Sequence, residues 1–210
     1  MAESCPLCNT KGSLFFQNKR HVFYTCGLCH GIFRDRKQLL DRKDEEERYL
    51  HHKSDINDTG YHHFVLPIVN KVKAHFESGK CGLDYGCGHT PVLSRLLSDE
   101  NYSMEIFDAI FFNKKAVLDK KYHFIVCCEV MEHFYNPCRE FKGLFELLLP
   151  EGKLICKTHL YEKGMDFDAW YYKNDPSHVF IYQKQTLEWI KDQFKCSGLE
   201  INKRLITFSK

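Results

Sequence analysis

The sequence predicts an α/β fold in which helices flank a mainly parallel sheet, with a small module in front of it. Short apolar runs alternate with segments of helical periodicity from residue 81 onward, which is the pattern of strands joined by helical crossovers. The runs are apolar at consecutive positions, as in strands that are buried on both faces. A chain of 210 residues is long enough for one such core and a small appended module, and too short for two full domains.

Four cysteines in residues 1–36 stand in two Cys-x-x-Cys pairs, Cys5 with Cys8 and Cys26 with Cys29. Seventeen residues separate the pairs, and this array is typical of a tetrahedral four-thiolate zinc site, in which iron can replace zinc. The apolar residues of this stretch are too few for an independent core. We therefore expect a zinc ribbon whose folding depends on metal binding, which contributes ~10 to 16 kcal/mol at such sites.

The ribbon also carries basic and aromatic side chains, for which two interpretations are open. Basic residues interleaved with aromatic ones are typical of surfaces that bind single-stranded nucleic acid. The same residue types also simply build small ribbons, and we take that structural role as the first interpretation and RNA binding as the alternative. The residues concerned are Lys11, Phe15, Phe16, Lys19, Arg20, Phe23, Tyr24, Arg34 and Arg36.

Residues 37–60 and 61–76 lead from this module into the main domain. Mixed charges with a few apolar side chains at 37–60 indicate a charged helical linker with a solvated outer face. Residues 61–76 have a largely helical apolar spacing and should pack against the sheet, with Pro67 in an early turn or at a kink. In the main domain, expected at 61–210, we predict strands at 82–85, 104–107, 123–127 and 153–156 and helices at 92–97 and 138–149.

A glycine-containing loop, Leu-Asp-Tyr-Gly-Cys-Gly-His-Thr at residues 83–90, ends the first of these strands and leads into a helix. Glycines let the backbone approach a ligand closely, and the following helix N-terminus offers unpaired N–H groups. Asp108 stands about 20 residues beyond Gly88, at the end of the next strand. A carboxylate there can accept hydrogen bonds from both hydroxyls of a ribose, so the two features together predict a site for a nucleotide-type cofactor.

The motif Asp84-x-Gly86-x-Gly88 resembles the first motif of class I S-adenosylmethionine-dependent methyltransferases, and the resemblance covers about residues 61–205. It implies a Rossmann-like sheet in which Asp84 orients the loop and the amino-acid part of the donor, the glycines lie against the donor, and Asp108 binds its ribose. The residues expected to bind the donor are Asp84, Tyr85, Gly86, Cys87, Gly88, Thr90, Asp108 and Glu129.

Two departures from the family pattern affect this loop and its surroundings. Thr90 stands where a third glycine is often found, and its side chain should narrow the space beside the methionine part of the donor. The interval between Asp108 and the strand at 123–127 is short and leaves little room for the usual strand and helix, with their adenine-contacting acid. No residue can therefore be assigned from the sequence as the one that contacts adenine.

The segment Glu-Val-Met-Glu-His at residues 129–133 directly follows the strand at 123–127, at the edge of the sheet where ligands of such folds bind. It resembles the fourth motif of the family, as in ubiquinone-pathway O-methyltransferases and small-RNA 2'-O-methyltransferases. In those enzymes the segment holds a divalent cation. The resemblance leaves two alternatives: Glu129, Glu132 and His133 bind magnesium or manganese, which would acidify an acceptor hydroxyl, or the Glu-His pair is kept without a metal.

The segment Asp-Pro-Ser-His at residues 175–178 is similar to an Asp-Pro-x-His segment of a broad subgroup of these enzymes. His159 and His178 are candidate general bases, because imidazole titrates near neutral pH. With Glu132 and His133 they complete the catalytic candidates. Alignment of two bound reactants can supply ~7 to 11 kcal/mol, whereas a general base adds ~10²- to 10⁴-fold, so positioning of the acceptor is expected to dominate.

These observations together predict a methyltransferase (EC 2.1.1.-) that uses S-adenosylmethionine and acts on an oxygen of a small organic acceptor. An RNA methyltransferase that uses the ribbon to bind RNA, and a donor-binding scaffold without catalysis, are the alternatives. The net charge of +2 provides no field that favours nucleic acid or membrane. No apolar run approaches the roughly 20 residues of a membrane span, and the N-terminus lacks a signal pattern. We expect a cytoplasmic protein, and the sequence does not indicate its oligomeric state.

Overall fold

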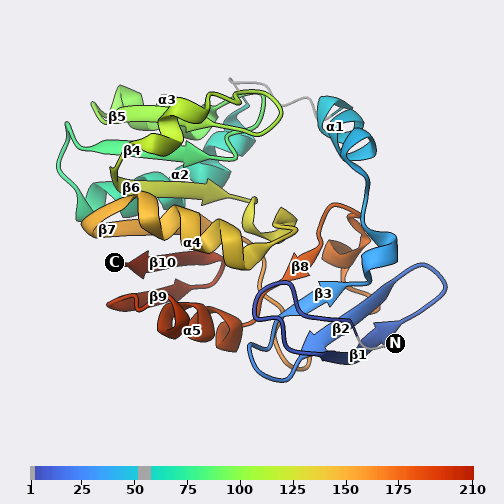
Figure 1. Ribbon diagram of the computed structural model, residues 1–210. Helices are drawn as coiled ribbons and strands as arrows, with labels where there is room; N and C mark the ends of the chain where they lie inside the picture. Colours follow the sequence, from blue (N-terminus) through green and yellow to red (C-terminus); the bar gives the residue numbers. More distant parts are fainter. Residues whose placement is uncertain (1–2, 52–57) are drawn as a thin grey trace.

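The computed structural model describes residues 3–51 and 58–210 and contains two sheets (Figure 1). The larger sheet has six strands in the order β5-β4-β6-β7-β10-β9, and the smaller has four in the order β1-β2-β3-β8. Helices flank the larger sheet on both faces. The predicted fold class, a mixed α/β protein with a mainly parallel central sheet, is confirmed.

The parallel part of the larger sheet consists of the four strands that the sequence predicts. They are β4 (Cys81–Tyr85), β5 (Ser103–Phe107), β6 (Tyr122–Cys128) and β7 (Leu148–Lys157). Two further strands follow near the C-terminus, β9 (Gly198–Asn202) and β10 (Leu205–Ser209), and β10 runs antiparallel to both β7 and β9. The carboxyl ends of the four parallel strands therefore meet at one edge.

Side chains of β6 show why both faces of the sheet are covered. Phe124 and Val126 pack in one buried cluster with α2 (Thr59–His75) and α3 (Val92–Asp99). Ile125 and Cys127 point to the opposite face and belong to the cluster that includes residues of α4 (Pro137–Leu147) and α5 (Lys184–Gln193). Because successive strand residues alternate between faces, a strand that is apolar throughout needs a helical layer on each side.

Two predicted details differ from the structure. The helix expected at 138–149 ends at Leu147, because Leu148 already pairs with Tyr122 of β6 and starts β7. Of the two alternatives for Pro67, an early turn or a kink, the early turn is wrong, because Pro67 lies in the middle of α2, on an exposed part of the helix surface. Water can there satisfy the carbonyl that loses its hydrogen-bond partner to the proline.

Between Asp108 and β6 the structure has only an isolated bridge to Phe112 and the short 3₁₀ helix η2 (Lys115–Asp119). Strand β5 is therefore at the edge of the six-stranded sheet. This agrees with the short interval in the sequence, which leaves no room for a further strand and helix beyond β5.

The smaller sheet joins the N-terminal module to the main domain. It contains β1 (Gly12–Gln17), β2 (Val22–Cys26), β3 (Ile32–Arg34) and β8 (Phe180–Ile181), all antiparallel. Strand β8 belongs to the main domain in sequence, yet it pairs with β3 through Ile32 with Ile181 and Phe33 with Phe180. The sequence does not predict this pairing, which makes the module and the main domain share one sheet.

The segment expected as a charged helical linker, 37–60, contains the end of the 3₁₀ helix η1 (Arg36–Gln38) and the helix α1 (Arg42–His51). Residues 52–57 of that segment lie outside the described residues. Two further 3₁₀ helices, η3 (Met131–His133) and η4 (Tyr171–Asn174), lie near the carboxyl ends of β6 and β7. Each helix in the described ranges is too short or too polar to cross a membrane.

Candidate functional site

Asp108 and the glycine loop lie together at the carboxyl ends of β4 and β5. One carboxylate oxygen of Asp108 accepts a hydrogen bond from the backbone N–H of Gly88 at 3.0 Å. The other accepts from the N–H groups of Ile110 and Phe111 at 2.9 and 3.0 Å. A carboxylate offers about four lone-pair positions, so these three bonds orient Asp108 and leave acceptor capacity toward a ligand.

Gly86 and Gly88 both have a left-handed backbone, with φ values of +76° and +65°. The N–H of Gly86 donates to the carbonyl of Phe107 at 2.8 Å and ties the loop to β5. A Cβ atom on Gly86 would lie 2.5 Å from a methyl carbon of Val130, whereas a Cβ on Gly88 would meet nothing within 4 Å. The loop thus needs glycine at position 86 because of the left-handed backbone and the close approach of Val130. At position 88 it needs glycine because of the left-handed backbone alone.

This difference predicts the outcome of a matched pair of substitutions. Gly88→Ala should lower the free energy of unfolding by ~1 to 2 kcal/mol, the cost of a left-handed alanine. Gly86→Ala should cost ~1 to 3 kcal/mol more, because Val130 must move within a packed site. Chemical denaturation of both variants measures the difference, and equal losses of stability would contradict the proposed clash with Val130.

A pocket of about 560 Å³ opens beside the loop, within the size range of small-ligand sites. Tyr85, Gly86 and Asp108 of the expected donor-binding residues line it, together with His133. Tyr85 stacks on Phe107 with 5.2 Å between ring centroids. The other expected donor-binding residues, Asp84, Cys87, Gly88, Thr90 and Glu129, lie outside the lining of this pocket.

Asp84 connects β4 to the helix that follows the loop. Its carboxylate is buried and accepts a hydrogen bond from the backbone N–H of Ser94 in α3 at 3.2 Å. Burial raises the pKa of Asp84 to about 7, against the opposing effect of the Ser94 hydrogen bond. Asp84 therefore holds the loop between its two flanking elements rather than facing the pocket.

Glu129 has an unusual backbone and a buried carboxylate. Its φ of +53° is a left-handed conformation that costs a non-glycine residue free energy and often marks functional sites. One carboxylate oxygen accepts from the Arg204 guanidinium at 2.7 Å, and the other is buried without a hydrogen-bond partner. Burial, followed by the charge of Glu132, raises the pKa of Glu129 to about 7.

Glu132, His133 and His178 form a cluster whose candidate ligand atoms all lie within 4.8 Å of one another. Glu132 is fully buried, which raises the pKa of its carboxyl, and it accepts a hydrogen bond from the hydroxyl of Tyr172. Its second carboxylate oxygen is buried without a hydrogen-bond partner. The rings of His133 and His178 are 4.9 Å apart between centroids.

Each of the two histidine rings is oriented by a hydrogen bond from its Nδ1 to a backbone carbonyl. Nδ1 of His133 donates to the carbonyl of Ser177 at 3.0 Å, and Nδ1 of His178 donates to the carbonyl of Tyr172 at 2.8 Å. In a neutral ring the lone pair then lies on Nε2. Burial and the neighbouring His133 lower the pKa of His178 to about 4, so its imidazole is neutral at pH 7.

The cluster differs from the metal-binding set expected from sequence. The expected set contained Glu129, Glu132 and His133, whereas the structure groups Glu132 and His133 with His178 and pairs Glu129 with Arg204. His159, the other candidate base, lies outside this cluster. Its Nδ1 is 3.4 Å from the hydroxyl of Tyr171, and burial lowers its pKa.

Tyr172 and Arg204 also belong to this site, although the sequence does not indicate that they do. They lie 40 and 75 positions from the acids that they contact, Glu132 and Glu129. Tyr172 falls in the segment that precedes the Asp-Pro-x-His motif, but no pattern indicates its contact with Glu132. Arg204 stands in the turn between β9 and β10 and belongs to no motif.

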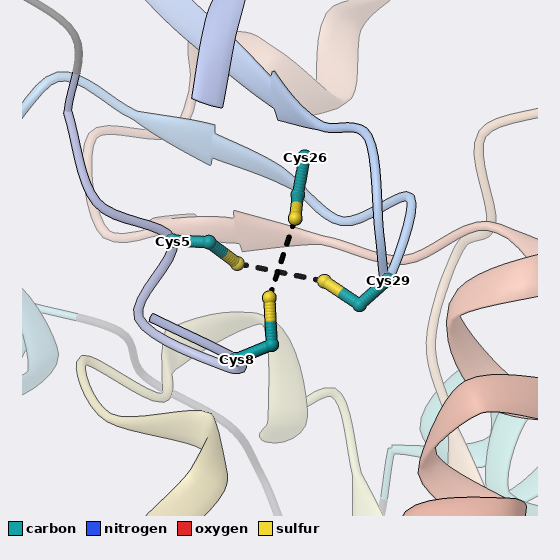
Figure 2. A group of neighbouring side chains, drawn as sticks. All are labelled: Cys5, Cys8, Cys26 and Cys29. Atoms are coloured by element: carbon teal, nitrogen blue, oxygen red, sulfur yellow. Dashed lines mark hydrogen bonds between the residues drawn. The ribbon is translucent and has the colours of Figure 1, made fainter. Parts of the chain in front are cut away.

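The four N-terminal cysteines converge on one point (Figure 2). The sulfur atoms of Cys5 and Cys29 are 3.5 Å apart, and those of Cys8 and Cys26 are 3.3 Å apart. Sulfur atoms in a tetrahedral zinc site with bonds of about 2.3 Å are separated by about 3.8 Å, so small adjustments would accommodate the ion. The hydrogen bond between Cys5 and Cys29 lowers the pKa of the Cys5 thiol and raises that of Cys29, so the two sulfur atoms share a proton that a bound metal would displace.

Three aromatic residues of the module pack against the main domain, whereas Tyr24 stacks on Phe33 within the module. Phe15, Phe16 and Phe23 each contact Phe167 edge-to-face, with centroid distances of 5.0 to 5.3 Å. Phe23 is completely buried. These rings hold the module against the main domain and are not arranged as an exposed platform on which bases could stack.

The sheet, the glycine loop and the acid at the end of the next strand define a nucleotide-type cofactor-binding α/β domain. Residues 58–201 match the family described as "Methyltransferase domain". Since the match spans more than half of the chain, this chain belongs to that methyltransferase family. A search of curated proteins found no match.

Solved methyltransferase structures share the fold of this chain. An O-methyltransferase family protein from Burkholderia thailandensis has a TM-score of 0.56 and 13% identity, with 79% of this chain and 61% of that chain covered. Magnesium protoporphyrin IX methyltransferase from Synechocystis PCC 6803, with bound SAM, has a TM-score of 0.51 and 14% identity, with 81% and 92% covered. At such identities the similarity is one of fold, and this chain spans about three fifths of the first protein's length.

Proposed function

We propose that this protein transfers the methyl group of S-adenosylmethionine to an oxygen of a small organic acceptor. The observation that carries this proposal is the pocket between the glycine loop and Asp108, which lies at the carboxyl edge of the sheet. In this proposal Asp108 accepts a hydrogen bond from the donor's ribose, and Gly86 lets the donor lie against the loop. Tyr85 would contribute an apolar wall. The family assignment and the SAM-bound relative of the same fold support this donor.

The transfer breaks the bond between the sulfonium sulfur and the methyl carbon as the bond from the acceptor oxygen forms, and it releases S-adenosylhomocysteine and one proton. We assign the proton to the cluster of Glu132, His133 and His178, because His133 also lines the donor pocket. The imidazole of His178 is neutral at pH 7, but its pKa of about 4 makes it a weak base, so Glu132, whose pKa burial raises, is the better proton acceptor of the cluster. His159 is the second candidate base.

As an alternative to accepting the proton, the same cluster has a donor set that fits a divalent cation, and His159 would then be the base. Glu132 supplies a carboxylate oxygen without a hydrogen-bond partner, and His133 and His178 supply imidazoles oriented by backbone carbonyls. One carboxylate and two imidazoles suit manganese or another transition metal better than magnesium, which prefers oxygen ligands. A bound cation would lower the pKa of an acceptor hydroxyl.

We likewise propose that the four N-terminal cysteines bind zinc.

An RNA acceptor is the second candidate, and one surface feature favours it. Lys19, Arg20, His21 and Lys173 line a pocket of about 670 Å³ at the tip of the β1–β2 hairpin, which could hold a phosphate. Of the aromatic rings that would stack bases, Phe23 is buried and Phe15 and Phe16 are partly buried against Phe167, so they form no exposed stacking platform beside this charged surface. We therefore keep the small organic acceptor as the first proposal and the cytoplasm as the proposed location.

Calorimetry with S-adenosylhomocysteine and single-stranded RNA tests these assignments. The proposed enzyme binds S-adenosylhomocysteine and shows little affinity for RNA at low salt. RNA binding that weakens steeply with salt, and that is lost in the Cys5→Ser, Cys8→Ser double variant, would favour the RNA methyltransferase. Donor binding without methyl transfer to any compound of a cell extract would favour a scaffold, and absence of donor binding would refute both enzyme assignments.

A further inference from the structure

Arg34, the last residue of β3, is a buried arginine that reaches from the cysteine module into the main domain. Only 5% of its surface is exposed. Its guanidinium donates to the backbone carbonyls of Lys173, Asp175 and His178, at 2.9, 2.8 and 3.2 Å. One arginine of the N-terminal module thus binds three carbonyls of a single turn in the main domain.

Burial of this charge requires compensation. Desolvation lowers the pKa of Arg34 to about 10, so the side chain stays charged at pH 7. Its guanidinium lies over the ring of Phe23, with 4.7 Å between the central carbon and the ring centroid, and among the described residues no carboxylate oxygen forms an ion pair with it within 4 Å. A buried charge must be satisfied by hydrogen bonds, and here the three carbonyls and His21 provide them.

The turn that Arg34 binds carries His178 of the candidate active site. The carbonyl of His178 is itself one of the three acceptors, and the N–H of His178 donates to Asp175 within the turn at 3.2 Å. The backbone on either side of Arg34 adds to the attachment, because the Arg34 N–H donates to Val179 at 3.0 Å and Phe33 pairs with Phe180. The position of His178 therefore depends on a strand that lies 144 residues earlier in the chain.

We propose that Arg34 is a positioning residue that holds the 173–178 turn so that His178 faces Glu132 and His133. The cysteine module is then a structural part of the acceptor side of the site, rather than an arm that binds RNA. A lysine cannot replace this arginine, because a single ammonium lacks the planar fork that reaches several carbonyls at once. The inference rests on the proposed function in one respect only, namely that the cluster of Glu132, His133 and His178 lies where the methyl acceptor binds.

Hydrogen exchange of the full-length protein tests the proposal, with Arg34→Lys compared with Arg36→Lys. Arg36 is exposed and lies two residues further in the same module, so it controls for the substitution itself. Arg34→Lys should accelerate exchange of the His178 and Val179 amides at least tenfold and leave β6 protected, while Arg36→Lys changes neither. Unchanged exchange in residues 173–180, or an equal increase throughout β4 and β6, would overturn the proposal.

Two binding measurements separate positioning from general damage. Manganese titration should show at least tenfold weaker binding in Arg34→Lys than in Arg36→Lys, while the affinity for S-adenosylhomocysteine stays within twofold in both. Failure of the unaltered protein to bind S-adenosylhomocysteine would refute the proposed function but not the inference, because the hydrogen-exchange result decides the inference by itself.

If Arg34→Lys does not fold, NMR of the unaltered protein tests the inference. A slowly exchanging Arg34 Nε–H supports the proposal, and exchange at the solvent rate overturns it.

Discussion

Replacing Asp108 by alanine is expected to weaken S-adenosylhomocysteine binding at least about a hundredfold. The carboxylate organises the loop through Gly88, Ile110 and Phe111, and in the proposed complex it also accepts a bond from a ribose hydroxyl. Hydrogen bonds to a charged group contribute ~1.5 to 3 kcal/mol each, so loss of the ribose bond together with one bond that orders the loop corresponds to ~10²- to 10⁴-fold in affinity. Isothermal calorimetry measures the change directly.

Two control variants accompany this experiment. Asp108→Asn keeps the shape and one acceptor oxygen, and it should retain more affinity than Asp108→Ala. Asp99→Ala removes an exposed carboxylate of α3 that pairs with Arg95, and its affinity should equal that of the unaltered protein. If Asp108→Ala binds S-adenosylhomocysteine normally, the pocket beside the glycine loop is not the donor site.

Replacing both Cys5 and Cys29 by serine is expected to remove the metal and unfold the N-terminal module. These cysteines face each other across the cluster, and the strands β1 to β3 contribute few buried side chains beyond those packed on Phe167. Metal binding at four-thiolate sites supplies ~10 to 16 kcal/mol of apparent free energy, more than the whole stability of many domains. Elemental analysis should find one zinc per chain in the unaltered protein and none in the variant.

The loss should extend beyond the module, because β3 pairs with β8 and Arg34 binds the turn that carries His178. Hydrogen exchange is expected to accelerate in residues 12–34 and 173–181 and to stay slow in β4 and β6. Cys138→Ser is the control, because Cys138 is exposed and outside the cluster. A metal-free double variant with full protection of β1 to β3 would show that the cysteines do not stabilise this module.

Much of the main domain follows from short stretches of sequence. The apolar runs at 82–85 and 123–127 predict two strands, since residues buried on both faces need no alternation. The glycines of the loop predict a tight turn, and the spacing from Gly88 to Asp108 predicts that loop and acid meet, as the 3.0 Å bond between them shows. The cysteine spacing likewise anticipates the convergence of four thiols.

The composition of the candidate active site could not be predicted in the same way. The resemblance to the family's Glu-x-x-Glu-His segment left two alternatives, a cation site of Glu129, Glu132 and His133 or a Glu-His pair without a metal. In the structure Glu129 has a left-handed backbone and pairs with Arg204, and His178 lies with Glu132 and His133. These contacts join residues 46 and 75 positions apart in the chain, and no local residue pattern encodes them.

Local patterns in the chain are sufficient for the order of strands and helices, the glycine loop and the cysteine cluster, because each arises from residues whose spacing is set by the geometry of one strand, turn or helix. The pairing of β3 with β8, the burial of Arg34 and the meeting of His178 with Glu132 join residues 46 to 149 positions apart in the chain. Such contacts depend on how complete elements pack and in which register they pair, and only the folded chain specifies that.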